Sequence, residues 1–242
     1  MNCSPKMLGT PPVENSTGRT QMMATIEMLD DWKVKELVVG MGFDTTSSNS
    51  GIRLGCCSLM ENELKRPLLW CACRHHSYEL HIKHAWQSLR GERTCPEEVL
   101  FKKFQSNWDD MDRDTSNLTL FDWPQDKNSD IWQQAKTVKK WAENCTLKET
   151  FPREDYRELI ELTLIYLGGS LPARNFHLRK PGAVHHARFM SKAIYLLKME
   201  LMSERFDFTV EERRQVNQMA VFISLFYARF FFTISHRRIR TY

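Results

Sequence analysis

The sequence has no long uninterrupted run of apolar residues. Its most apolar stretch, Met219 to Ile234, is sixteen residues long and contains Arg229, whereas a helix needs about 20 apolar residues to cross a bilayer. We therefore expect this stretch to be a buried helix, and we expect no membrane partner. The start of the chain also lacks the apolar segment of a secretory signal, so we expect an intracellular protein.

Strand signals are scarce as well. Two short apolar runs, Leu37–Phe43 and Leu68–Cys73, have the composition and flanking turns of buried strands. Helical spacing over Ile52–Leu64 separates them, which predicts two parallel strands joined by a crossover helix. Two strands are too few for a stable sheet, and the residues before position 20 offer no further strand. We therefore expect an incomplete sheet with an exposed edge, unless a partner chain covers it.

The remainder of the chain shows helical spacing only. This order of elements predicts an α/β part followed by an all-α part. We expect a loose tail at residues 1–19, the α/β part at 20–91 and the helical part at 92–242. Two capping-box patterns, Thr94 with Glu97 and Thr209 with Glu212, mark helix starts. The other expected helices are Met22–Trp32, Tyr78–Leu89, Ile131–Cys145, Glu154–Leu167 and His186–Met202.

Acidic residues are absent from residues 171–199, although the net charge of the whole chain is only +4. We treat this stretch as a basic segment that contacts DNA phosphates, because cations that neutralise phosphates release counterions and bind in a salt-sensitive way. A solvated basic face is the alternative. The balance is reversed in residues 109–130, where we expect an exposed acidic loop. The candidate nucleic-acid-binding residues are Arg174, Arg179, Lys180, Arg188 and Lys192.

The cysteines do not suggest a disulfide framework, because their number, seven, is odd and some lie inside apolar patterns. Two cysteines and four histidines between residues 71 and 84 raise the alternative of a small zinc module, to which His185 and His186 would contribute. The spacing fits no standard zinc finger or ribbon, so we do not expect zinc. The plain alternative for Cys73 and His76 is a packed strand-to-helix junction.

Asp44 is the one candidate catalytic residue. An apolar strand that ends on an aspartate places a carboxylate at the edge of a sheet, where metal-dependent phosphoryl-transfer folds bind divalent ions. Asp44 is therefore a candidate ligand for Mg²⁺ or Mn²⁺. Two metals about 3.5–4 Å apart need several carboxylates, and one aspartate does not supply them. The alternative is that Asp44 caps the turn and helix that follow it.

Three blocks of the sequence, taken in order, resemble the catalytic core of hAT-type (hobo/Ac/Tam3) DNA transposases and of proteins derived from them. The first, Asp44 with Asn49 behind it, is similar to the family's second catalytic aspartate. The second, Cys73 with His76, is similar to the family's C-x-x-H motif at the start of a helix. The third is Arg188 followed by phenylalanine, where the family has an Arg-Trp motif.

The resemblance implies an RNase H-like core in which two Asp and one Glu hold two divalent metals, and it implies a nuclear protein that acts on DNA. The strand that carries the family's first aspartate has no counterpart here, and no glutamate can be assigned as the third ligand. We therefore expect Asp44 to be a vestigial metal ligand, and we expect no independent strand transfer and no small-molecule substrate. The rival readings are a non-enzymatic helical protein-interaction module and the zinc module.

Overall fold

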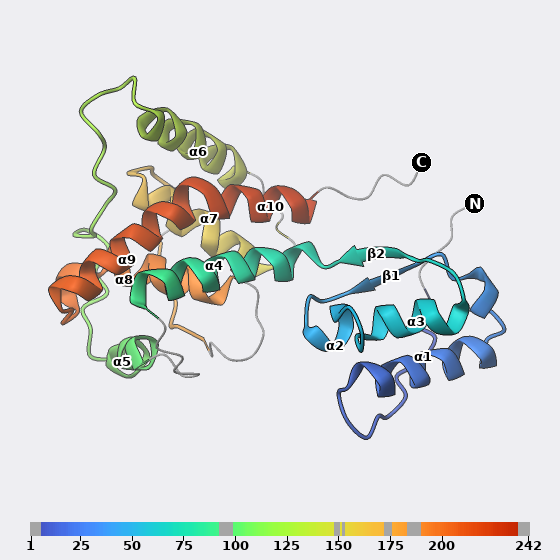
Figure 1. The fold of residues 1–242 in the computed structure, drawn as a ribbon. Helices are drawn as coiled ribbons and strands as arrows, with labels where there is room; N and C mark the ends of the chain where they lie inside the picture. The colour runs from blue at the N-terminus through green and yellow to red at the C-terminus, as the bar shows by residue number, and fades with distance from the viewer. Residues whose placement is uncertain are drawn as a thin grey trace. The chain divides into compact units, whose positions relative to one another are not determined.

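The computed structural model describes residues 6–91, 99–147, 151, 153–171, 176–182 and 190–236. It is mostly helical with a small two-stranded parallel sheet (Figure 1). The chain divides into two compact units, residues 1–77 and 78–242. The boundary lies within helix α4 (Arg74–Arg90), whereas the sequence suggested a boundary near residue 91. The broad expectation of an α/β part followed by helices is confirmed at this level.

The first unit is built around two short strands, β1 (Gly40–Phe43) and β2 (Leu69–Ala72), which pair in parallel. In the described part of the chain they form a two-stranded sheet. Helix α3 (Cys56–Leu64) lies between them in sequence, and Lys65 ends it in the left-handed region at φ 51°. Glu61 of α3 fixes the entry to β2, because its Oε1 accepts hydrogen bonds from the Leu68 amide at 2.8 Å and the Trp70 indole at 3.0 Å.

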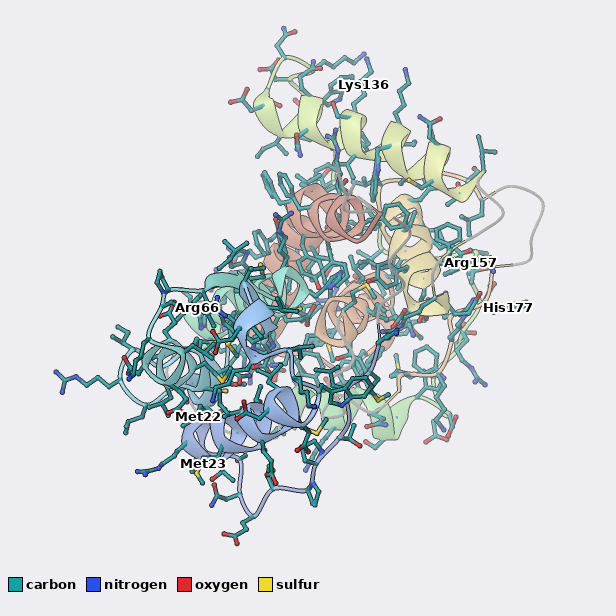
Figure 2. All side chains as sticks on the ribbon, turned by 90° about the vertical axis from the view of Figure 1, so that its right-hand side faces the viewer. Met22, Met23, Arg66, Lys136, Arg157 and His177 are labelled. Atoms are coloured by element: carbon teal, nitrogen blue, oxygen red, sulfur yellow. The ribbon has the colours of Figure 1, made fainter. Side chains whose placement is uncertain are left out.

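Helix α1 (Gly18–Asp31) packs against α3. It begins four residues earlier than the apolar spacing suggested, because Thr17 caps it through the Thr20 amide. Met22 of α1 packs on the small core of this unit, whereas Met23 is exposed (Figure 2). The residues before the helix are also tied to it, since the Trp32 indole donates to the Leu8 carbonyl at 3.0 Å. The core consists of Leu29, Cys56, Met60 and Leu68.

Two expectations for this unit were wrong. Ile52 does not belong to the helix before β2. It lies between the short helix α2 (Ser47–Ser50) and α3, and Ile52 is 90% exposed. The strands are also shorter than the apolar runs and are not buried, since all four residues of β2 are exposed. Apolar composition predicted the strands correctly but not their burial, because burial depends on neighbouring elements, and the sheet has only these two strands among the described residues.

The second unit is a helical bundle around one large core. Helix α7 packs against α6 and α8, and α8 packs against α9. Ser129 and Thr209 cap α6 and α9 through their side chains, and Thr209 with Glu212 forms the expected capping box. Besides residues 78–90 of α4, the α-helices described in this unit are α5 (Val99–Asn107), α6 (Asp130–Thr146), α7 (Glu154–Tyr166), α8 (Ser191–Leu201), α9 (Val210–Phe222) and α10 (Ala228–His236).

A π-helical turn, Ile223–Tyr227, joins α9 to α10, so that the three run on as one helix (Figure 1). By length and composition its span Val210–Thr233 could cross a membrane, and 56% of its most apolar window is buried inside the protein. A core helix passes the same test, and Ile223, Tyr227 and Phe231 are all buried in the helical core. The expected buried helix is therefore present.

Glu200 is a charged residue in this core with an incomplete set of partners. Only 2% of the residue is exposed, and its Oε1 accepts a hydrogen bond from the Asn217 side-chain amide at 2.7 Å. Its Oε2 has no hydrogen-bond partner among the described residues. Burial raises the pKa of this carboxyl above the ordinary value for glutamate. Ionised Glu200 is therefore a cost to the folded state.

We expect Glu200→Gln to stabilise the protein at pH 7 by on the order of 1 kcal/mol, because glutamine keeps the Asn217 bond and removes the buried charge. A folded-state pKa above the unfolded value means that stability is lost as the pH rises through the folded pKa. The difference in unfolding free energy between the variant and the wild type should consequently disappear near pH 4, where Glu200 is protonated in the folded state and largely protonated in the unfolded state. Urea unfolding at both pH values measures it, and a destabilised variant at pH 7 would contradict the burial argument.

Candidate site at the carboxyl edge of the strand pair

Asp44 follows β1 directly and lies at the carboxyl edge of the parallel pair. Its Oδ1 accepts three hydrogen bonds: from the Thr46 hydroxyl at 2.6 Å, the Thr46 amide at 3.0 Å and the Asn49 side-chain amide at 2.7 Å. The bonds from Thr46 and then Asn49 lower the pKa of the carboxyl, and the charge of nearby His76 adds to this. Asp44 is therefore an ionised, exposed carboxylate that organises the turn leading into α2.

Cys73 and His76 lie beside Asp44. The last paired residues are Phe43 and Ala72, and the Cys73 amide extends the ladder by donating to the Phe43 carbonyl at 2.7 Å. Both strands thus end at the same edge, and His76 follows in the first turn of α4. Cys73 and His76 are half-buried. The structure brings Asp44, Asn49, Cys73 and His76 to the same edge of the strand pair.

This edge does not fit the two-metal centre that the resemblance implies. In the described part of the chain, no group of three or more His, Cys, Asp or Glu side chains converges on a point where a metal ion would bind. The Oδ1 of Asp44 is already surrounded by three donors. Hard divalent ions require several oxygen ligands, and we derive no catalytic step through a metal here.

The zinc alternative has no assembled site in the described residues either. Cys71 is exposed and Cys73 is half-buried, and both are free thiols. Cys56 and Cys57, the other thiols of this unit among the described residues, are buried. Burial raises the pKa of Cys57 to about 11, so this thiol is protonated and packs as an apolar group. His185 and His186 lie outside the described residues.

We expect Asp44→Ala to destabilise the turn and α2 by about 1 kcal/mol, as loss of a capping acceptor usually does. Asp44→Asn keeps an oxygen acceptor and should cost less. Because the folded-state pKa is lowered, the contribution is present above the unfolded pKa and lost as the pH falls through the folded value. Hydrogen exchange at the Asn49 and Ser50 amides reports the loss, and unchanged protection in the alanine variant would show that Asp44 is not a cap.

Residues 176–182, which belong to the basic segment and precede α8, pack against the rest of the second unit. Leu178 and Pro181 are buried, whereas Arg179 and Lys180 are exposed. Arg179 pairs with Glu154 of α7 at 3.0 Å, and Lys180 pairs with Asp109, in the loop after α5, at 2.6 Å. Lys192 is half-buried in the first turn of α8. Arg174 and Arg188 lie outside the described residues.

The acidic loop is less free than its composition suggested. Arg205 holds its backbone by donating to the carbonyls of Asp112 at 3.2 Å, Asp114 at 2.5 Å and Asn117 at 2.9 Å. The Phe121 amide then donates to the Tyr166 carbonyl at 2.7 Å. The aspartate side chains themselves remain exposed. The loop therefore presents its carboxylates from a fixed backbone.

Glu79 has a structural role that the sequence did not indicate. Its Oε1 accepts from the Met190 amide at 2.8 Å and from the Tyr227 hydroxyl. Met190 is in the left-handed region at φ 74° and starts α8. Glu79 therefore ties α4 to the start of α8 and to the π-helical turn. These partners are more than 100 residues away, so no local spacing could have revealed them.

Comparison of the chain with protein-family models, with curated proteins and with solved structures gave no match.

Proposed function

We propose that this chain is a transposase-derived protein of the hAT type that binds DNA through its basic segment and carries out no strand transfer on its own. The observation that supports it best is the carboxyl edge of the strand pair. A parallel pair presents Asp44, Asn49, Cys73 and His76 together, which is the grouping that the resemblance implies. Asp44 is then a vestigial ligand for Mg²⁺ or Mn²⁺, in a nuclear protein.

The unpaired edges of the two-stranded sheet suggest that a partner chain binds there. In the described part of the chain, each strand pairs on one side only, and Leu69 and Trp70 of β2 are 67% and 38% exposed. Unpaired strand edges attract further strands. We therefore expect a second chain to complete the sheet, and we expect the isolated protein to aggregate readily; a clean monomer with a sharp single melt would count against this.

DNA affinity tests the main proposal. We expect the double substitution Arg179→Ala/Lys180→Ala to weaken binding to a labelled DNA duplex by roughly tenfold at low salt. It should also lower the slope of log K against log salt by about 1–2, because two phosphate contacts are lost. The matched control Lys140→Ala/Arg214→Ala removes two other exposed cations of the same unit and should change neither quantity much. Equal effects of the two double variants would refute the assignment.

A second candidate function is favoured by an exposed aromatic stripe. Phe226 and Phe230 on the last long helix are 45% and 52% exposed. The rings of Phe222 and Phe226 form a tilted pair with centroids 6.2 Å apart. Large exposed apolar side chains in a row indicate a protein-interaction surface. Loss of a binding partner after Phe226→Ser/Phe230→Ser, with DNA affinity unchanged, would support this function.

A further inference from the structure

The basic segment between residues 176 and 182 has a fixed backbone and outward cations. Lys198 of α8 donates to the Arg179 carbonyl at 2.7 Å, and the Tyr195 hydroxyl donates to the Gly182 carbonyl. Leu178 and Pro181 face the core. His177 is exposed on the same segment as the two cations (Figure 2).

The cations of this segment are already occupied by carboxylates of the same unit. Glu154 pairs with Arg179 at 3.0 Å and with Arg157 at 3.3 Å, so one carboxylate serves two guanidinium groups. Asp109 pairs with Lys180 at 2.6 Å. Arg113, Glu161 and Lys198 are further charged groups whose fields reach these pairs. A phosphate that approaches the segment consequently meets cations that already have carboxylate partners.

These pairs are exposed enough to exchange partners. The side chains of Arg179 and Glu154 are 44% and 63% exposed, and those of Lys180 and Asp109 are 57% and 66% exposed. Exposed ion pairs contribute little to stability, so a closely spaced row of phosphates can displace the carboxylates at low cost. We infer that Glu154 and Asp109 form an autoinhibitory contact, in which they occupy the phosphate-binding cations and weaken DNA binding until a polyanion displaces them.

The inference rests on the proposed DNA contact of the basic segment, and a matched pair of double variants tests it. Asp109→Asn/Glu154→Gln releases the basic segment. Asp207→Asn/Glu204→Gln also removes one aspartate and one glutamate, and it likewise releases one lysine (Lys103) and one arginine (Arg213) elsewhere on the same unit. The two variants have the same net charge. Their affinities for a fluorescein-labelled DNA duplex are compared at several salt concentrations, with circular dichroism as a check of folding.

We expect the release variant to bind the duplex threefold to tenfold more tightly than the control variant, with the difference shrinking as salt rises. A result in which the release variant binds the duplex and the control variant does not also supports the inference. Equal affinities of the two variants overturn it, even where the wild type binds DNA and Arg179→Ala/Lys180→Ala weakens that binding; the proposed function then survives by itself. Absence of binding by every form, down to low salt, overturns both.

Discussion

Replacing Lys198 with methionine should destabilise the second unit by about 3–5 kcal/mol, the usual cost of breaking a buried ion pair from one side. Only 1% of the Lys198 side chain is exposed, and its ammonium lies 2.7 Å from Glu158 and 5.7 Å from the Trp108 ring centre. Burial lowers the pKa of Lys198, and the neighbouring Glu158 opposes that shift. Without Lys198, the Glu158 carboxylate, 13% exposed, has lost its buried counterion.

The double variant Lys198→Met/Glu158→Gln should recover most of this loss, because it removes both charges together. Urea unfolding followed by tryptophan fluorescence measures the effect, since five of the seven tryptophans lie beyond residue 77. A double-mutant cycle then isolates the pair from the packing of the lysine stem. A single variant within about 1 kcal/mol of the wild type would show that the pair is not structurally important.

Replacing Gly18 with alanine should destabilise the first unit by roughly 2–3 kcal/mol. Gly18 is the buried first residue of α1. A Cβ there would lie 2.3 Å from the Leu54 carbonyl oxygen, 2.6 Å from the Ser48 carbonyl oxygen and 2.7 Å from the Cys56 amide nitrogen. All three are backbone atoms, so they cannot move aside as a flexible side chain would.

Helix propensity makes the opposite prediction for this substitution, since alanine in a helix is favoured over glycine by about 1 kcal/mol. The measured sign therefore decides between local propensity and packing. Gly42→Ala is the matched control, because a Cβ at Gly42 meets nothing within 4 Å. Hydrogen exchange of the α1 and α3 amides reports the first unit specifically. A stabilised Gly18→Ala variant would mean that α1 does not pack on the loop before α3 as described.

The sequence was a good guide to the helices with local signals. Helix α9 starts at the predicted capping box, and α6 and α7 lie within one residue of their predicted ends. The stretch from Gly51 to Gly55 was misjudged for a local reason. A Cβ at Gly55 would lie 2.4 Å from the Gly51 amide nitrogen, so the two glycines form a tight turn where apolar spacing predicted a continuous helix.

Only those features of the site that follow from the order of the strands and from local sequence could be predicted. Parallel pairing made it predictable that Asp44 and Cys73 share an edge, and the polar run behind Asp44 made the cap predictable. The ion pairs of Arg179 and Lys180 were not predictable, because their partners lie 25 and 71 residues away and periodicity carries no information on such contacts. The same holds for Lys198, which lies within the predicted basic segment and which the structure places in the core.

We propose that Asp44, at the edge of a sheet that has two strands in the described part of the chain, does not support cleavage or joining of DNA. A nicking assay on supercoiled plasmid tests it most directly, with the purified chain in Mg²⁺ or Mn²⁺ and Asp44→Ala as the comparison. We predict that the wild type and the variant show the same background, with no metal-dependent nicking by either. Metal-dependent nicking by the wild type that Asp44→Ala abolishes would contradict the claim.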